Sequence, residues 1–291
     1  MRAGVVYPQV ELGGDPGAVK AFAQAAEDLG YDHFVMYDHV LGAEHAGREP
    51  ELWGPYTEQD PFHEVFITFA YLAGITDRIE FTTGVLVLPQ RQTALVAKQA
   101  ADIDLFSGGR LRLGVGVGWN WVEYDALETG AHYRRRGRRE EEQIALLRRL
   151  WTEPVIEHAD TDHRVDRAGI LPMPKRSIPI WLGGFSAPAF GRAARIADGF
   201  VFSAERQTEA VDAKTRLDAM LVELGRGDDD FGFESLQRYD RGADRWAADI
   251  NAWRTAGGSH ISVMTMGAGL SSVDRHIDAI RQWREVYVNA L

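Results

Sequence analysis

The chain has 291 residues, of which 45% are hydrophobic and 26% are charged, so it can bury a large core and shows no sign of disorder. Its 32 Lys and Arg residues are outnumbered by 43 Asp and Glu residues, and the net charge of −11 argues against nucleic acid or an anionic membrane as a partner. The absence of cysteine excludes disulfides, thiolate catalysis and cysteine-ligated zinc. The first residues predict a short strand instead of a signal peptide, and no apolar run is long enough to cross a membrane, so we expect a cytoplasmic protein.

Strands and helices are predicted to alternate along the whole chain. Apolar and β-branched runs predict the strands, and apolar side chains at helical spacing predict the helices. The predicted strands are 3–7, 33–37, 79–87, the glycine-rich run after Gly109, 178–182, 199–203, 231–236 and 260–265, and the predicted helices are 16–29, 62–74, 93–106, 138–151, 187–197, 208–224, 243–256 and 273–288. The strand at 231–236 has the weakest pattern. Residues 152–177 hold prolines, charges and short apolar pieces, which predict an excursion from the core that includes a small hairpin.

The alternation predicts the fold class. Each helix supplies the crossover that brings the next strand beside the last, so the strands form a parallel sheet. Eight such units in fewer than 300 residues fit a closed (β/α)8 barrel, the TIM barrel. A doubly wound open sheet is the alternative. Because no linker or internal repeat divides the chain, residues 1–291 are predicted to form a single domain, with the excursion between the fourth helix and the fifth strand.

The most unusual stretch is Ser107–Asn120, in which paired glycines precede an alternation of glycine with apolar residues. A backbone without side chains lets a flat cofactor ring approach closely, so Gly116 is a candidate cofactor contact, with Trp119 and Asn120 beside it. The glycines lack the spacing of a dinucleotide-binding fingerprint. Glycines that only relieve crowding inside a barrel are the alternative explanation.

Two pairs of residues at predicted strand ends are candidates for chemistry, because TIM barrels carry their active sites there. Asp38 and His39 follow the second strand, where an imidazole can move a proton and a carboxylate can hold its tautomer or bind a ligand amide. A helix cap with a loop hydrogen bond is an equally simple explanation. Gly84 and Val85 interrupt the third strand, which is typical of a bulge, a close backbone approach, a non-proline cis peptide bond or a plain kink.

Gly183 and Gly184 follow the fifth strand and precede Ser186, which is placed to cap the next helix. Free amides of a glycine turn at a helix N-terminus bind anions, and phosphate is the natural occupant. Ser203 and Arg206, after the sixth strand, are predicted to add a hydroxyl and a cation. The basic run 134–139 is followed by glutamates and is better explained as a solvated helix face than as a phosphate site. The nine histidines show no ligand spacing, so no metal site is predicted.

Several segments together carry a family resemblance that runs through most of the chain. They are Tyr37-Asp38-His39, the run 83–89 (TGVLVLP), the run 97–101 (AKQAA), Ser107–Asn120 and the run 179–184 (PIWLGG) with 193–199 (AARIADG). With these segments the sequence resembles the luciferase-like monooxygenase family and, within it, the branch of deazaflavin (coenzyme F420)-dependent oxidoreductases. The resemblance implies a (β/α)8 barrel that holds a flavin or deazaflavin at its C-terminal mouth.

The resemblance also assigns roles to residues at that mouth. Gly84 and Val85 would form a backbone bulge, cis in several relatives, that supports the cofactor ring. Asp38 would contact the ring or fix His39, and His39 would act as acid/base on the substrate. The cofactor phosphate would be bound by the glycine turn after the fifth strand and by the polar residues after the sixth, namely Gly183, Gly184, Ser203 and Arg206.

Three functions follow from the resemblance. The first is hydride transfer between F420 and a small organic substrate, with His39 moving one proton. The second is monooxygenation by reduced FMN, with a separate flavin reductase as partner, and the third is non-catalytic flavin binding. In the sugar-phosphate dehydrogenase branch of the family, an acidic residue stands at the position of Trp119. Its replacement by tryptophan argues against a sugar-phosphate substrate. It also leaves His39 without the acid/base partner that this branch has there. The aromatic loop 41–61 suits an apolar or planar substrate, and a homodimer is expected because relatives are often dimers.

Overall fold

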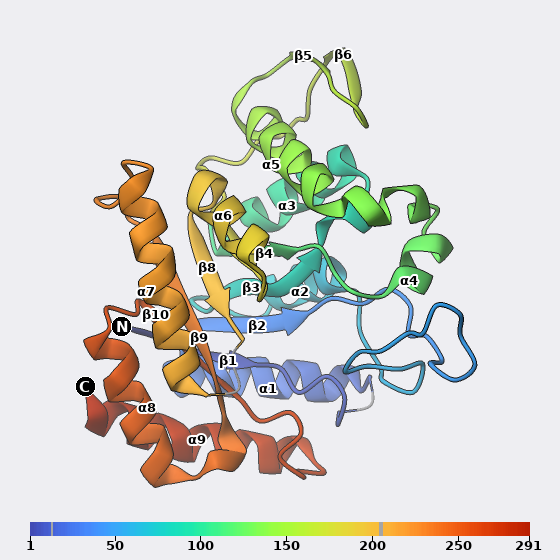
Figure 1. Ribbon diagram of the computed structural model, residues 1–291. Helices are drawn as coiled ribbons and strands as arrows, with labels where there is room; N and C mark the ends of the chain where they lie inside the picture. Colours follow the sequence, from blue (N-terminus) through green and yellow to red (C-terminus); the bar gives the residue numbers. More distant parts are fainter. Residues whose placement is uncertain (13, 204–205) are drawn as a thin grey trace.

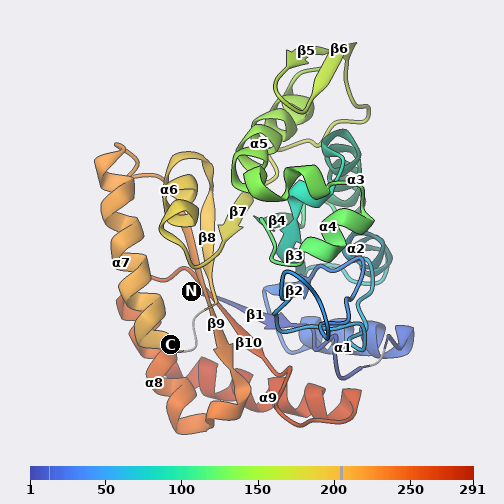
Figure 2. The same ribbon diagram turned by 45° about the vertical axis from the view of Figure 1, so that its right-hand side comes forward.

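The computed structural model describes residues 1–12, 14–203 and 206–291. Eight parallel strands close into a barrel in the order β1-β10-β9-β8-β7-β4-β3-β2, and a two-stranded sheet, β5-β6, is separate from it. Figures 1 and 2 show helices covering the outside of this barrel. The predicted TIM barrel is therefore confirmed, and the alternative of an open doubly wound sheet is wrong.

The barrel strands are short and apolar, as expected where both faces of a parallel sheet are covered. They are β1 (Arg2–Val6), β2 (His33–Tyr37), β3 (Glu80–Val87), β4 (Leu111–Gly116), β7 (Ile180–Gly183), β8 (Gly199–Phe202), β9 (Gly232–Arg238) and β10 (His260–Met264). β9 is the strand with the weakest predicted pattern. Its charged residue Glu234 lies inside the barrel, where the carboxylate is 2.8 Å from both His33 and Arg112, so a buried ion pair replaces the expected apolar side chain.

The helices lie where the apolar spacing predicts them, with an addition after β4. They are α1 (Pro16–Asp28), α2 (Val65–Ala73), α3 (Thr93–Phe106), α4 (Trp121–Ala126), α5 (Arg136–Thr152), α6 (Ala187–Ile196), α7 (Gln207–Glu223), α8 (Ala243–Thr255) and α9 (Val273–Ala290), with 3-10 turns η1 (Leu88–Gln90), η2 (Gly130–Arg135) and η3 (Tyr239–Arg241). The helix predicted at 138–151 is α5, and the short α4 and η2 precede it. In the described part of the chain, no helix has the length and apolar character needed to span a membrane.

The predicted excursion contains an antiparallel hairpin, β5 (Ile156–Ala159) and β6 (Arg164–Ala168), that projects beyond α5 in Figure 1. Asp160 at its turn accepts hydrogen bonds from His158 Nε2 at 2.8 Å and His163 Nδ1 at 2.9 Å. This is a group of His and Asp residues able in principle to hold a metal ion. The distances between these nitrogen and oxygen atoms are those of direct hydrogen bonds. Atoms that bind a metal ion between them have to lie farther apart.

The barrel interior is filled by two kinds of side chain. The ion pair of Glu234 lies toward the amino-terminal ends of the strands. An apolar cluster of Val6, Val35, Trp181, Val201 and Leu236 is the second kind, and the Arg112 guanidinium of the polar group lies 4.0 Å from the centroid of the Trp181 ring. Because described side chains fill the interior, as expected of a TIM barrel, we expect a ligand to bind at a mouth of the barrel.

Candidate active site at the carboxyl ends of the strands

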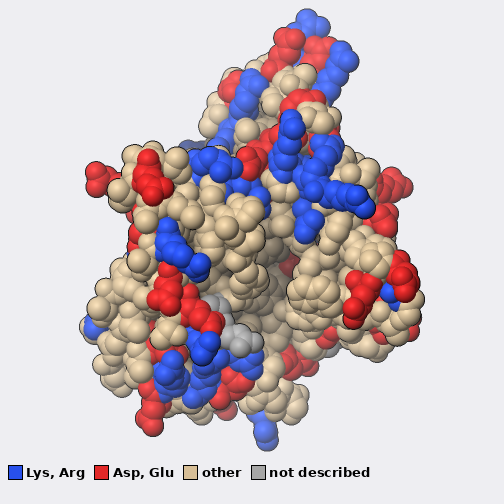
Figure 3. Space-filling model, viewed as in Figure 1, with Lys and Arg blue, Asp and Glu red and all other residues tan. Residues whose placement is uncertain are grey.

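Four neighbouring strands, β2, β3, β4 and β7, bring most of the predicted site residues together. Asp38 and His39 follow β2, Gly84 and Val85 lie in β3, and the glycines of β4 and β7 lie beside them. In the space-filling view of Figure 3, the molecule is hollowed near the centre, where these strands end. The order of the strands therefore gathers residues from distant parts of the sequence at one mouth.

The predicted interruption of β3 is a β-bulge. Met36 pairs with Thr83, but the next residue, Tyr37, pairs with Val85, so Gly84 is the extra residue. A Cβ atom on Gly84 would lie 2.7 Å from the Tyr37 ring, which explains why glycine is needed. The peptide bond after Gly84 is trans, because both cis bonds in the described part of the chain precede prolines. The bulge considered at Gly84 is thus present, and the peptide bond between Gly84 and Val85 is not the cis bond that was also considered there.

The glycines of β4 and β7 do not leave bare backbone open at the mouth, which corrects the expectation drawn from their missing side chains. A Cβ atom on Gly116 would lie 2.7 Å from Val85 Cγ1, and one on Gly183 would lie 3.1 Å from Val85 Cγ2. On Gly114 it would lie 2.1 Å from the carbonyl oxygen of Thr83. The glycines make room for β3 to lean across β4. Val85 is partly exposed, so it is the candidate surface for a ring at this place, and this contact stays a prediction.

Asp38 is buried, and its carboxylate is engaged by the next strand. Arg91 Nη2 donates to Oδ1 at 2.6 Å, and the backbone N–H of Val87 donates to Oδ2 at 3.1 Å. Burial raises the pKa of the Asp38 carboxyl, and the Arg91 guanidinium offsets part of this. These contacts tie the end of β2 to the end of β3. Of the two roles expected of Asp38, the fixing of His39 belongs to another residue. Contact between Asp38 and the cofactor ring stays a prediction.

Glu123, which the sequence analysis missed, is the carboxylate partner of His39. His39 Nδ1 lies 3.1 Å from Glu123 Oε2, which also accepts from Gln90 Nε2 at 3.2 Å. The other oxygen, Oε1, accepts from the backbone N–H groups of Val40 at 2.6 Å and Leu41 at 3.0 Å. Burial alone would raise the pKa of Glu123, but the hydrogen bonds from His39 and the two amides outweigh it and hold that pKa below its usual range. The carboxylate is therefore ionised.

A sequence signal for Glu123 existed in the start of α4. Asn120 and Glu123 have the spacing of an N-cap residue and an acid in the first helical turn. Asn120 Oδ1 accepts the backbone N–H of Glu123 at 3.2 Å, which begins the helix and places the carboxylate beside His39. Glu123, four residues after Trp119, is thus the carboxylate that lies beside His39.

An aromatic wall surrounds His39. The rings of Phe62, Tyr56 and Trp119 lie edge-on to the imidazole, with centroids 5.0, 5.4 and 5.7 Å away. A Cβ atom on Gly54 would lie 2.3 Å from the Trp119 ring, so the loop 41–61 packs directly on this tryptophan. Aromatic rings of the loop region and Trp119 thus border His39, whereas their role as a boundary of the substrate stays a prediction.

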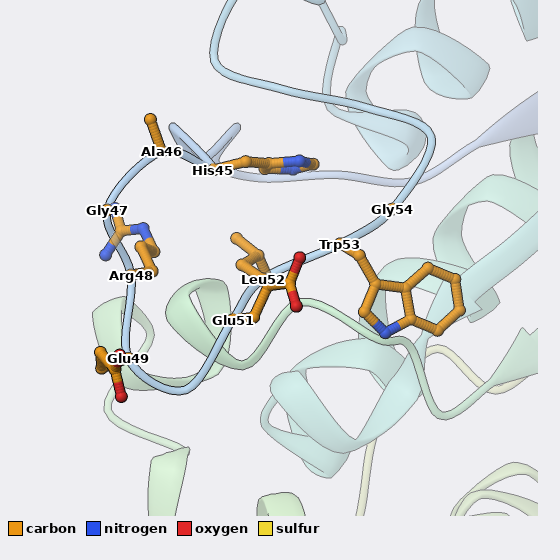
Figure 4. A pocket seen from close by; sticks show the side chains of 9 residues that line it. All are labelled: His45, Ala46, Gly47, Arg48, Glu49, Glu51, Leu52, Trp53 and Gly54. Atoms are coloured by element: carbon orange, nitrogen blue, oxygen red, sulfur yellow. The ribbon is translucent and has the colours of Figure 1, made fainter.

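The same loop forms a pocket of about 580 Å³, shown in Figure 4. Its lining residues all come from one bend of the loop and are His45, Ala46, Gly47, Arg48, Glu49, Glu51, Leu52, Trp53 and Gly54. The His45 ring lies edge-on to Trp119, with centroids 5.9 Å apart. The pocket is therefore connected to the wall around His39 through one tryptophan.

The turn after β7 has the predicted features of a helix start. Gly184 has a φ of +143°, which favours glycine, and a Cβ atom on it would lie 2.9 Å from Ala189 in the first turn of α6. Ser186 caps α6, its hydroxyl accepting the backbone N–H of Ala189 at 3.4 Å. The geometry suits an anion at the start of α6.

The polar residues after β8 lie at the surface. Ser203 and Arg206 are both exposed. The Arg206 guanidinium lies 2.6 Å from the Glu209 carboxylate in the first turn of α7. Its charge is thus partly compensated locally, and binding of a phosphate by Ser203 and Arg206 stays a prediction.

The closed barrel, with an imidazole–carboxylate pair at the carboxyl ends of its strands, has the architecture of TIM-barrel enzymes. A sequence profile described as luciferase-like monooxygenase matches residues 1–239. The chain belongs to the luciferase-like monooxygenase family, whose members are oxidoreductases and monooxygenases that include F420-dependent and FMN-dependent proteins. This confirms the family resemblance.

Individual relatives show both cofactor types. An uncharacterized protein of Mycobacterium tuberculosis is 35% identical over 187 residues, 62% of each chain. The F420-dependent hydroxymycolic acid dehydrogenase of the same species is 29% identical, over 65% of this chain and 50% of its own length. The FMNH2-dependent dimethylsulfone monooxygenase of Pseudomonas fluorescens is 27% identical, over 72% of this chain and 60% of its own. The match thus spans about three fifths of the length of the first of these relatives.

Solved structures agree on the fold. The monooxygenase RslO1 of Streptomyces bottropensis is similar with a TM-score of 0.77 and 17% identity over 99% of both chains. At this identity the likeness concerns the barrel alone.

Proposed function

We propose that this protein is an oxidoreductase that uses F420 for hydride transfer to or from a small organic substrate, with His39 as acid/base. The observation that carries the proposal is the His39–Glu123 pair at the mouth, 3.1 Å apart and bordered by aromatic rings. A histidine with a buried anionic partner is suited to move a proton near neutral pH. Similarity to an F420-dependent dehydrogenase supports the choice of cofactor.

The residues at the mouth fit a flat ring with a phosphate tail. Val85, seated over Gly116 and Gly183, offers an apolar surface for the ring. The Gly184 turn at the start of α6 offers backbone amides for the phosphate. When bound, F420 supplies a ring carbon that exchanges hydride with the substrate.

The residues of this chain then have three tasks. Val85 and Trp119 bound the space in which donor and acceptor stack, which orients them for transfer. The aromatic wall excludes water around His39. The free ring nitrogen of His39 gives a proton to the substrate oxygen as a carbonyl is reduced, or removes it as an alcohol is oxidised.

The second candidate is monooxygenation with reduced FMN, favoured by similarity to the FMNH2-dependent monooxygenase. In that case a flavin reductase would be a partner. Non-catalytic flavin binding is the third candidate and predicts no turnover. We also propose a homodimer and keep the cytoplasmic location and the single domain over 1–291 as predictions.

Separate titrations with F420 and FMN, followed by ring fluorescence, test the cofactor. We expect the tighter binding for F420, and reduction of F420 in a screen of small apolar alcohols or oxidation of its reduced form by ketones. Preferential binding of FMN, with oxygen consumption once the flavin is reduced, would favour the monooxygenase instead. Failure to bind either cofactor would contradict the site assignment.

The His39→Ala variant tests the acid/base role. We expect cofactor affinity close to that of the wild type and turnover lowered by about 10²–10⁴-fold, because proton transfer contributes on this order. His158→Ala, on the hairpin, is the matched control. Loss of cofactor binding in His39→Ala would make this residue a binding contact and not an acid/base.

A further inference from the structure

We infer that Glu123 is a positioning residue whose one carboxylate fixes both the imidazole of His39 and the start of the loop 41–61. The inference rests on the proposed function, in which His39 moves a proton and the loop bounds the substrate. It assigns Glu123 no contact with substrate or cofactor. Through Glu123, the tautomer and orientation of His39 depend on the position of the loop 41–61.

The first step concerns the tautomer of His39. An ionised carboxylate only accepts hydrogen bonds, so the ring nitrogen facing it must carry the proton. Because Nδ1 lies 3.1 Å from Glu123 Oε2, the hydrogen is on Nδ1 and neutral His39 has its lone pair on Nε2. Nε2 is then the nitrogen left to exchange a proton with a substrate. A buried anion behind Nδ1 also stabilises the imidazolium that forms when Nε2 takes up a proton.

The second step concerns the capacity of the carboxylate. Its two oxygens together accept from four donors, which are the His39 ring, the Gln90 amide and the backbone N–H groups of Val40 and Leu41. A carboxylate offers about four lone-pair sites. None is left for a substrate, so Glu123 acts through its neighbours.

The third step connects the loop. The side chains of Val40 and Leu41 are exposed, so apolar burial does not hold this part of the backbone in place. The amides of both residues are held by Glu123 instead. Farther along, the loop packs on Trp119 through Gly54. A displacement of the loop's first residues therefore pulls on the carboxylate that orients His39.

The remaining charges near Glu123 leave this arrangement intact. Asp38 is the other carboxylate that faces it, and its charge is matched by Arg91 at 2.6 Å. Arg91 also pairs with Glu64 at 2.9 Å on the far side. His39 is thus the cation-forming group that Glu123 itself contacts.

Two variants of the full-length protein separate the two functions of the carboxylate. In Glu123→Gln, the carboxamide oxygen still accepts from the two loop amides, but its NH2 group donates toward Nδ1 of His39. We expect the His39 tautomer to change to Nε2–H, as read from imidazole ¹⁵N shifts, while hydrogen exchange at Val40 and Leu41 stays within about threefold of the wild type. In Glu123→Ala, exchange at these amides should rise by about 10-fold or more.

Activity gives a third readout. With F420 and a substrate found in the screen, Glu123→Gln should lower kcat more than it raises KM, because the Nε2–H tautomer no longer offers its lone pair to the substrate. Glu128→Gln, an exposed acid just after α4, is the matched control and should leave all three readouts unchanged.

An Nε2–H tautomer in the wild-type protein, or unchanged exchange in Glu123→Ala, would overturn the inference. Both measurements need no cofactor, so they distinguish its failure from failure of the proposed function. If Glu123→Ala does not fold, as judged by circular dichroism, the wild-type tautomer and the Glu123→Gln comparison still decide.

Discussion

A buried acid on α5 is a residue at which pH acts directly on stability. Glu140 is 1% exposed and accepts one hydrogen bond, from Arg192 Nε at 3.0 Å, while its Oε1 has no hydrogen-bond partner among the described residues. Burial raises the pKa of Glu140 to about 7, against the opposing effect of Arg192. Because the folded pKa lies above the ordinary value of 4.5, the folded protein keeps a proton that the unfolded chain releases between these pH values. Stability from this group is therefore lost as pH rises toward 7.

The Glu140→Gln variant removes this titration. We expect its free energy of unfolding, relative to that of the wild type, to increase by roughly 2 kcal/mol between pH 5 and pH 7.5, as follows from linkage. Urea denaturation at both pH values measures the difference. Glu141→Gln, at the next and more exposed position, is the control and should show little pH dependence. A difference between Glu140→Gln and wild type that is the same at both pH values would contradict the prediction.

At the scale of elements, the site depends on how β3 lies over β4. β3 and β4 shift register between Thr82 and Leu86, and the glycines of β4 accept the inward lean of β3. Val85, which the sequence analysis named together with Gly84, reaches the mouth for this reason. The surface that we expect a cofactor ring to contact therefore depends on how β3 and β4 pack together.

The Gly116→Ala variant tests this packing. The new methyl group would lie 2.7 Å from Val85 Cγ1, so Val85 has to move toward the mouth. We expect a stability loss of about 1–3 kcal/mol, typical of overpacking, and a loss of F420 affinity of about 10-fold or more. Gly191→Ala on α6 is the control, because the nearest atom, in Arg195, would be 3.6 Å away and alanine favours the helix by up to about 1 kcal/mol. Unchanged F420 affinity in Gly116→Ala would show that Val85 is not part of the ring site.

These elements also show what could be predicted from the sequence. Hydrophobic periodicity was sufficient for the barrel, the prolines and charges of residues 152–177 for the excursion with its hairpin, and the glycine inside the third strand for the bulge at Gly84. The strand-end rule was sufficient to select His39 as a candidate. Glu123 was missed because an acid in the first turn of a helix is ordinary until the loop after β2 folds against it. The role of Gly116 was misjudged because the atoms that fill its space belong to another strand. Both errors concern contacts between distant segments, which local patterns do not contain.

At the scale of the whole molecule, one outer face is unusually apolar. α2 has no charged residue in its nine positions, and its outward side chains include Ile67, 71% exposed, and Tyr71, 47% exposed. Leu95 on the neighbouring α3 is 52% exposed. Large apolar side chains grouped on adjacent helices mark interaction surfaces in globular proteins. This face is where we expect the proposed homodimer to form, with a second copy of the chain covering it.

The Tyr71→Asp variant tests that assignment. A charge buried in an apolar interface without a partner costs several kcal/mol, so we expect the dimer to dissociate. Light scattering after size exclusion should give twice 32.5 kDa for the wild type and 32.5 kDa for the variant. Val288→Asp, an exposed apolar position on α9, is the control and should leave the dimer intact. Since the chain carries a net charge of −11, added salt should strengthen wild-type association by screening repulsion between copies, and a wild-type mass of 32.5 kDa at both low and high salt would contradict the homodimer itself.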